Sequence, residues 1–285
     1  MKTVSSLKKD LEFNIGLLSL IEALKNIAVS QFHALESKMK DYDTLLNAIN
    51  SFFELIDPNQ AKHPFLIPRN KTQIVVAMTS DSGLLGGLNM QVVNAALREL
   101  EQMPGRLVVV GERGKAYAVD AAIPFVYFPG IKEEEQYSQV KQLRDYLVNC
   151  FLKESMGFLK VVFPRPISFT VQKAEVVNVL PFCHDSSAGI QSSQAPLPDV
   201  ILDSRPEDII EYLVYLWMGQ KLSQIFVLSR LAEFAARFVH LEGGSQRLKE
   251  MEITLRMQYF HVRHEMVDRN MRELFAARLL YANQN

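Results

Sequence analysis

Two glycine-containing loops are the parts of this sequence whose residue types and position could bind a ligand. Residues 79–89 read Thr-Ser-Asp-Ser-Gly-Leu-Leu-Gly-Gly-Leu-Asn, and residues 111–115 read Gly-Glu-Arg-Gly-Lys. Each follows a predicted strand and opens a predicted helix, where backbone N–H groups can bind a phosphate. Neither loop has the spacing G-x-x-x-x-G-K-[ST] or G-x-G-x-x-G. We therefore favour structural strand-to-helix turns over a nucleotide site.

Histidine and cysteine give no stronger signal for catalysis or metal binding. His261 and His264, with Glu265, could share one helix face as metal ligands, but without a third placed ligand a solvated face is favoured. Cys150 and Cys183 lie far apart, and neither has a histidine that the sequence assigns as its base. No G-x-S-x-G sequence is present. The sequence thus predicts no catalytic residue, no metal and no cofactor.

Composition narrows the class of protein. The chain has 285 residues, of which 48% are hydrophobic, and 31 Lys and Arg balance 32 Asp and Glu. This is enough apolar material for a core in one or two domains, and the charge balance disfavours a nucleic-acid partner. No apolar run reaches the ~18 residues needed to cross a bilayer, and the N-terminus has no signal-peptide core. We therefore expect no direct membrane insertion, no secretion, and free thiols in a reducing compartment.

The N-terminal segment, residues 1–56, has the spacing of one long helix. From Ser5 to Leu55 there is no proline and one glycine, Gly16, and apolar residues recur in steps of three and four. The series is Leu7, Leu11, Ile15, Leu18, Ile21 (or Leu20), Leu24, Ala28, Phe32, Leu35, Met39, Tyr42, Leu46, Ile49 and Phe53. A helix of this length would measure ~75 Å, too long to pack on an ordinary globule.

The middle segment, residues 57–205, alternates short β-branched runs with helical stretches. Predicted strands cover 72–79, 106–111, 125–128, 158–163 and 168–179, and predicted helices cover 90–103, 112–121 and 134–153. This order, with nearly continuous apolar strands, predicts a Rossmann-like α/β domain whose parallel sheet lies between helices. Residues 185–198 are rich in Ser, Gly and Pro and indicate a mobile linker.

The C-terminal segment, residues 206–285, again has helix spacing. One series keeps a period of 3.5 residues and is apolar except at Ser245 and Glu252: Leu231, Phe234, Phe238, Leu241, Ser245, Leu248, Glu252, Leu255, Tyr259, Val262 and Met266. This period predicts a coiled-coil seam. Further on the seam shifts to Met271, Leu274 and Phe275, and Gly243-Gly244 predicts a bend or a close backbone approach.

The simplest arrangement pairs the two terminal helices in an antiparallel coiled coil and inserts the α/β domain between them. Long helices need a partner for their apolar stripe, because propensity alone seldom holds them in water. The C-terminal helix is longer by roughly 25 residues, which leaves an overhang of ~35–40 Å. This overhang ends in apolar residues that include Leu274 and Phe275. The sequence therefore implies that another chain buries it.

Four strings, in the same order along the chain, resemble the gamma subunit of F-type ATP synthases. Residues 20–31 are similar to the family's I-T-x-A-M-x-M-V-A-x-x-K, and residues 79–89 to T-S-D-x-G-L-C-G-x-x-N. Residues 176–181 resemble the L-L-P ending of the last domain strand, and residues 233–238 resemble S-E-x-x-A-R-M. Because the ordered set spans nearly the whole chain, the resemblance is global.

This resemblance implies a non-catalytic rotor that transmits torque between a membrane ion-driven ring and a hexamer of alternating alpha and beta subunits. An epsilon subunit is a further implied partner, and the implied location is the cytoplasmic face of the bacterial inner membrane, as a peripheral part of the complex. By the resemblance, and for the last three also by the apolar overhang, the residues that contact partners are Leu24, Arg237, Arg263, His264, Met271, Leu274 and Phe275.

The chain also departs from the family pattern. Residues 267–270 read Val-Asp-Arg-Asn where the family has I-T-x-E, and Leu24 and Gln31 replace Met and Lys. These differences favour a divergent or alternate-type ATPase gamma subunit. Two other functions stay open: a nucleotide-binding α/β enzyme with coiled-coil arms, and a rotor-derived scaffold. The sequence leaves open proton or sodium coupling and the direction of the reaction.

Overall fold

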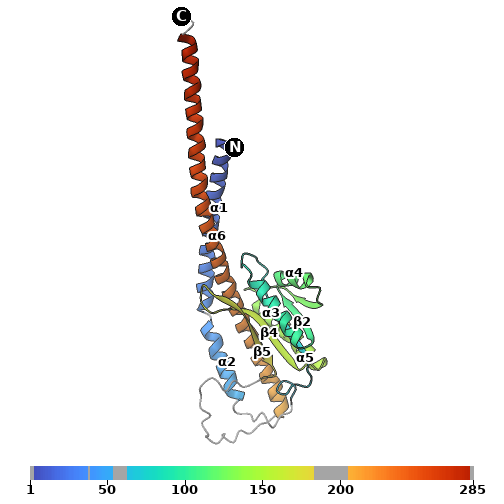
Figure 1. The fold of residues 1–285 in the computed structure, drawn as a ribbon. Helices are drawn as coiled ribbons and strands as arrows, with labels where there is room; N and C mark the ends of the chain where they lie inside the picture. The colour runs from blue at the N-terminus through green and yellow to red at the C-terminus, as the bar shows by residue number, and fades with distance from the viewer. Residues whose placement is uncertain (1–2, 38, 54–62, 183–204, 283–285) are drawn as a thin grey trace. The chain divides into compact units, whose positions relative to one another are not determined.

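The computed structural model describes residues 3–37, 39–53, 63–182 and 205–282. Its elements are α1 (Val4–Glu36), α2 (Met39–Phe53), β1 (Gln73–Met78), α3 (Leu88–Gln102), β2 (Gly105–Val110), α4 (Glu112–Asp120), β3 (Phe125–Phe128), α5 (Gln136–Lys153), β4 (Phe158–Pro166), β5 (Gln172–Leu180) and α6 (Pro206–Ala282) (Figure 1). Each strand and helix expected between 72 and 179 is present within a few residues. Cys183 and the linker expected at 185–198 lie outside the described residues.

Contacts between residues divide the chain into two compact units. The helical unit comprises Met1–Ala28 and Phe238–Asn285, and the sheet unit comprises Val29–Arg237. Both α1 and α6 continue from one unit into the other. The division at 56/57 and 205/206 that the sequence suggests stays a prediction.

The sheet unit is built on a five-stranded sheet in the order β3-β2-β1-β4-β5. Strands β1 to β4 pair in parallel, as the continuous apolar runs predict, but β5 pairs antiparallel with β4. The link from Pro166 to Gln172 explains this difference, because Ile167 N–H donates to the Val171 carbonyl at 3.0 Å and closes a tight turn. So short a connection can join only antiparallel strands.

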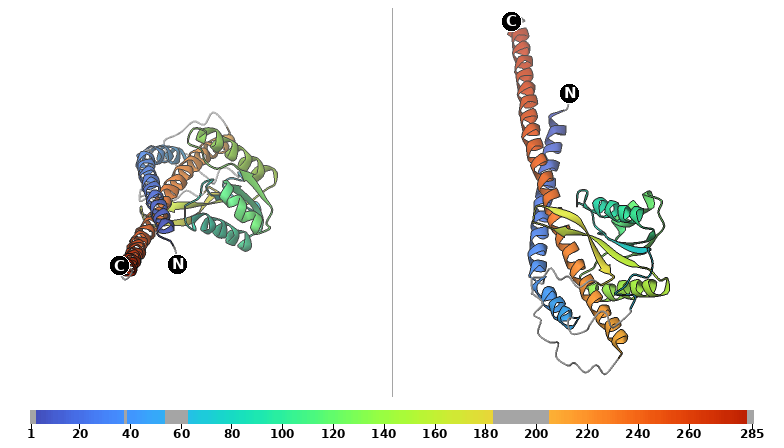
Figure 2. Two further views of the ribbon diagram at one scale, coloured as in Figure 1. Left: turned by 90° about the horizontal axis from the view of Figure 1, so that it is seen from above. Right: turned by 60° about the horizontal axis from the view of Figure 1, so that its bottom comes forward.

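Side chains of β1 alternate between two cores, one on each face of the sheet. Ile74, Val76 and Met78 point to the core that α5 and α6 complete, whereas Val75 and Ala77 point to the core that α3 and α4 complete. All five side chains are fully buried. Figures 1 and 2 show the helices on the two sides of the sheet. The first part of α6 is thus a core element of the α/β fold as well as the start of the long helix.

The N-terminal segment forms two helices, where the sequence predicts one. Helix α1 ends at Glu36 and α2 begins at Met39. At the break the Ser37 hydroxyl donates to the Ala34 carbonyl at 3.1 Å. Serine often competes in this way with the helix backbone. No proline or glycine marks the position, so the breaker residues used to read the sequence do not reveal it.

The helical unit is an antiparallel pair made of α1 and the C-terminal part of α6 (Figures 1 and 2). Asn14 contacts Leu248 and Lys25 contacts Glu242, so rising numbers on α1 meet falling numbers on α6. The α1 residues that face α6 repeat as a heptad: Val4, Leu7, Leu11, Asn14, Leu18, Ile21, Lys25 and Ala28 are buried or half-buried. On α6 the predicted seam is buried or half-buried from Leu241 to Val262, and Met266 is exposed.

Two predictions about these helices need correction. The helix is continuous through Gly243-Gly244. A Cβ at Gly243 would meet nothing within 4 Å and one at Gly244 would lie at an ordinary contact distance of 3.8 Å from Ile21, so neither glycine is required for a close backbone approach. Among the described helices, α1 alone is long and apolar enough to cross a membrane by length and composition, although no uninterrupted apolar run was found. Its hydropathy comes from two apolar faces, one of which packs on α6 and also buries Asn14 and Lys25.

Candidate functional site

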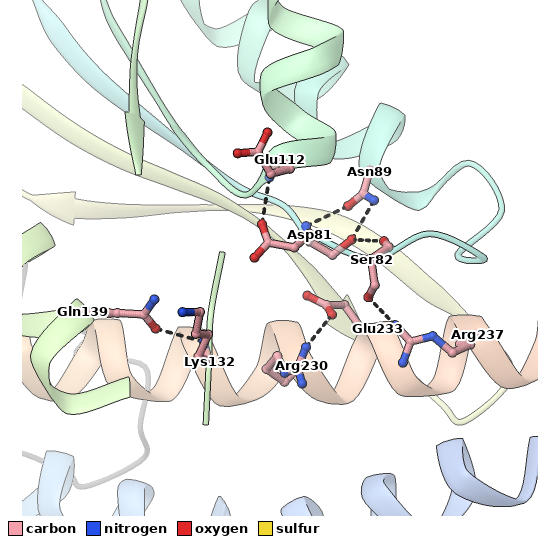
Figure 3. A network of polar contacts seen from close by, with 10 residues as sticks. Asp81, Ser82, Asn89, Glu112, Lys132, Gln139, Arg230, Glu233 and Arg237 are labelled. Carbon is pink, nitrogen blue, oxygen red and sulfur yellow. Dashed lines mark hydrogen bonds and ion pairs between the residues drawn. The ribbon is translucent and has the colours of Figure 1, made fainter. Parts of the chain in front are cut away.

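The loop of residues 79–89 is held by its own polar side chains. Asn89 Oδ1 accepts from Ser80 N–H at 3.2 Å, and Asn89 Nδ2 donates to Ser80 Oγ at 2.9 Å. Ser80 Oγ in turn donates to the Ser82 carbonyl at 2.8 Å. Ser80 and Asn89 are buried. These contacts, drawn in Figure 3, fix the loop as a rigid turn between β1 and α3.

The same loop contacts the N-terminus of α4. Residues 111–115 at this helix end are one of the two candidate phosphate-binding turns of the sequence. Asp81 Oδ1 accepts from Glu112 N–H at 2.9 Å, and Thr79 Oγ1 accepts from Gly114 N–H at 3.0 Å. A Cβ at Gly114 would overlap Thr79, so only glycine allows this approach. A helix N-terminus favours an anion, and here the Asp81 carboxylate supplies it. The geometry thus supports the structural turn and leaves these N–H groups engaged within the chain.

The other side of the loop docks on α6. Arg237 donates to Ser82 Oγ at 2.6 Å, which joins residues far apart in sequence (Figure 3). From the same loop and helix, Leu85 and Leu88 form a small buried cluster with Ala232 and Ala236. Alanine at both α6 positions leaves room for the leucines. We call this set of contacts the loop–helix clamp.

A buried charge lies beside the clamp on α6. Glu233 is 2% exposed and forms an ion pair with Arg230 at 3.0 Å. Burial raises the pKa of Glu233 against the pull of Arg230 and Arg237, and burial lowers the pKa of Arg237. Because a buried carboxylate is costly unless paired, the two arginines are held near it. Arg237, which the resemblance assigns to partner contact, therefore also has an intramolecular role.

The other residues assigned to partner contact lie in the helical unit. Leu24 is half-buried on α1, while Arg263, His264, Met271, Leu274 and Phe275 are exposed on α6. His261 Nε2 lies 3.3 Å from Glu265, and among the described residues no group of three His, Cys, Asp or Glu side chains could hold a metal ion. Contacts of these residues with other chains stay a prediction.

Two exposed apolar stripes at heptad spacing include several of these residues. The α1 stripe consists of Phe13, Leu17, Leu20, Leu24 and Ile27, of which Phe13, Leu20 and Ile27 are more than half exposed. The α6 stripe consists of Ile253, Met257, Phe260, His264, Val267, Met271 and Leu274. The shift that the sequence suggests after Met266 is thus the continuation of a second stripe that begins at Ile253. Such contiguous exposed apolar surface marks an interaction site.

Sequence reasoning missed the polar residues of the helix pair and of the clamp. Reading apolar positions alone placed Ile15 and Leu24 in the seam, whereas the structure buries Asn14 and Lys25. A strict heptad counted from Val4 and Leu7 would have found both. Nothing in the sequence pairs Ser82 with Arg237, because their contact depends on the tertiary fold.

The chain has relatives along nearly its whole length. Residues 16–277 match the family model described as ATP synthase. The ATP synthase gamma chain of Clostridium novyi (strain NT) is 21% identical over 264 residues, and that of Clostridium acetobutylicum is 23% identical over 266 residues; each alignment covers 90% of both chains.

Solved structures agree at the level of the fold. A chain of the Euglena gracilis mitochondrial ATP synthase rotor, in rotational state 1, matches with a TM-score of 0.65 at 17% identity, covering 93% of this chain and 98% of that one. A chain of the same organism's OSCP/F1/c-ring assembly, in rotational state 3, matches with a TM-score of 0.64 at 16% identity. With its elements, its order of motifs and the family match in agreement, this chain belongs to the ATP synthase gamma family.

Proposed function

We propose that this chain is the central stalk subunit of a rotary ATP synthase and transmits torque between a membrane ion-driven ring and an alpha/beta hexamer. One observation carries the proposal: α6 is a single helix of 77 residues that is clamped by the α/β fold at one stretch and presents an exposed apolar stripe at another. A continuous helix with both features can carry a twist applied at the α/β fold to a partner bound along the stripe.

The proposed bearing residues are those of the two stripes, together with Arg263 and Phe275 on the exposed part of α6 and, in the sheet unit, Arg237. Leu24, His264, Met271, Leu274 and Phe275 supply apolar or weakly polar surface, and Arg237 and Arg263 supply cations. A rotor must contact the surrounding subunits at several angles of rotation. Apolar contacts with few directional bonds allow this, because they do not depend on one orientation. We assign these residues to contacts with alpha and beta subunits.

The finer parts of the proposal follow from the same role. The subunit is non-catalytic and binds no cofactor, and the sheet unit is its attachment to the ring and to an epsilon subunit. The complex is peripheral to the membrane, at the cytoplasmic face of a bacterial inner membrane. The engaged N–H groups at the start of α4 speak against the alternative of a nucleotide-binding enzyme.

Reconstitution with alpha and beta subunits tests the proposal. The expected result is one copy of this chain in each hexamer and ATP hydrolysis that depends on its presence. A chain truncated after Met266 should assemble more weakly, since it lacks Met271, Leu274 and Phe275. Failure to form a complex would favour the rotor-derived scaffold, and tight binding of ATP or NAD by the isolated chain in equilibrium dialysis would favour the enzyme.

A further inference from the structure

The interface between α1 and α6 in the helical unit contains a charged layer. Lys25 is 8% exposed at a seam position and forms ion pairs with Glu22, at 3.0 Å, and with Glu242. Ser245, fully buried in the α6 seam, donates to Glu22 Oε1 at 2.8 Å. Lys249 Nζ lies 3.5 Å from the same carboxylate oxygen. Every charge in the layer thus has a partner on the opposite helix.

The apolar seam does not by itself define how far α1 is shifted along α6. The seam residues of both helices repeat every seven positions, and most of them are aliphatic or aromatic. Within the helical unit, a slip of one heptad would therefore replace one set of apolar contacts with a similar set. In coiled coils, polar residues at seam positions often decide such questions of register, at a cost in stability.

The charged layer opposes a slip in either direction. Moving α1 seven residues toward the C-terminus of α6 would place Lys25 opposite Lys249 and Glu22 opposite Glu252, so like charges would meet. Moving it the other way would carry Lys25 seven residues past Glu242, so this buried cation would lose its partner on α6 and keep only Glu22 on its own helix. Unpaired buried charge is costly, so both alternatives are disfavoured.

Asn14, by contrast, does not distinguish the native register from a slipped one. It is 3% exposed, and its Nδ2 donates to the Leu248 carbonyl at 3.0 Å. Because every α6 residue carries a backbone carbonyl, the same side chain could find an acceptor after a slip. Asn14 is therefore a buried polar residue of the same seam that can serve as a matched control.

We propose that the layer of Glu22, Lys25, Glu242, Ser245 and Lys249 sets the register of the two helices. It thereby fixes which part of α6 extends past α1. Every residue from 263 to 278 is exposed, and this stretch holds much of the α6 stripe. A slip of one heptad would cover or uncover two turns of it. The inference concerns the isolated chain and does not depend on the proposed partners.

Distances between two spin labels measure the register directly. In the full chain with Cys150 and Cys183 replaced by alanine, labels are attached at Lys9→Cys and Arg272→Cys, both exposed sites within the helical unit. These sites are offset along the helix axis, so a slip of one heptad changes their axial separation by about 10 Å. The unmodified layer should give one narrow distance distribution.

Two variants and two controls test whether the charged layer sets the register. Lys25→Leu should add a second population displaced by about 10 Å, while Lys25→Arg, which keeps the cation, should not. The double variant Lys249→Glu with Glu252→Lys makes the slipped register attractive and should populate it with Lys25 in place. Asn14→Leu should keep one distance. A single native distance in Lys25→Leu and in the double variant, or an equal second population in Asn14→Leu, would overturn the proposal; circular dichroism checks that each variant is helical.

Discussion

Helix α6 runs through both units, and the two units differ in how much of its apolar surface they bury. In the sheet unit α6 packs Ile210, Val214, Met218 and Leu222 into a fully buried core. Further along the same helix, Ala232 and Ala236 are part of the loop–helix clamp. In the helical unit α6 buries a mostly apolar seam that includes Ser245, and it leaves Met257, Met271 and Leu274 at least half exposed. Apolar surface is thus hidden where the chain supplies its own partner and exposed where, we propose, another chain must. The difference separates two parts of α6. The anchoring part packs in the core of the sheet unit, and the bearing part is the exposed stretch that we propose contacts other chains.

The largest expected effect concerns the bearing part. Met271→Asp with Leu274→Asp should weaken assembly with alpha and beta subunits by more than a hundredfold. Burial of each apolar side chain contributes about 1.5–3 kcal/mol, and the introduced charges add a desolvation cost. Titration of the hexamer with labelled chain measures the loss, and the thermal stability of the isolated chain should be unchanged.

Glu273→Gln is the matched control for that pair, because Glu273 is exposed on the same turn and pairs with Arg269 at 3.1 Å. It should assemble like the wild type. Equal assembly of all three chains would show that the stripe does not bind the partner.

A second change addresses the anchoring part. Gly114→Ala should destabilise the sheet unit by about 1–3 kcal/mol, because the new methyl group overlaps Thr79 where the loop meets α4. Urea unfolding followed by circular dichroism measures the loss. A variant as stable as the wild type would mean that the loop is not held tightly against α4.

Gly243→Ala is the opposite case in the helical unit. Its Cβ would meet nothing within 4 Å, so alanine adds helix propensity without a clash. We expect a gain of about 1 kcal/mol in the free energy of unfolding. A loss in thermal denaturation would instead point to a requirement for glycine that the helix packing does not explain.

Ser82→Ala removes the bond between Arg237 and the loop. The expected loss is about 1 kcal/mol, since Arg237 stays partly solvated and Leu85 and Leu88 stay packed on α6. Hydrogen exchange should accelerate in residues 80–88 and not in β2. Uniform acceleration across the sheet unit would contradict the local role assigned to this bond.

The smallest expected effect is the contribution that Glu22, in the helical unit, makes to the pH dependence of stability. Hydrogen bonds from Lys25 and Ser245 lower the pKa of Glu22 to about 2, from a usual value of 4.5. A lowered carboxyl pKa means that its contribution to stability is complete above 4.5 and is lost as the pH falls from there to about 2. Contacts with Glu242 and Glu22 raise the pKa of Lys25, so the contribution of Lys25 is lost above the usual 10.5.

Thermal unfolding between pH 2 and 6 measures the acid limb. Glu22→Gln should flatten it, whereas Glu12→Gln, an exposed change on the same helix, should not. An identical pH dependence in wild type and Glu22→Gln would remove Glu22 from the account.

The sequence predicts the sheet unit well because its signals are local. Continuous β-branched runs locate β1 to β4, and the steps of three and four locate α1 and most of α6. It fails where a single side chain or a tertiary contact decides. The first helix ends at Glu36 without a proline or glycine, Lys25 occupies an apolar-looking seam because Glu242 faces it, and Arg237 contacts Ser82 only after folding. Of the candidate site, exposure of the overhang is confirmed, while its contacts with partners stay predictions.

Rotation of the anchoring part against the hexamer tests the central claim most directly. A bead attached at Tyr137→Cys, an exposed site on α5, reports the motion of the sheet unit while immobilised alpha/beta hexamers hydrolyse ATP, with Cys150 and Cys183 replaced by alanine. The account predicts stepwise rotation in one direction that stops when ATP is withdrawn. A bead that stays fixed on hexamers that bind this chain and hydrolyse ATP would contradict it.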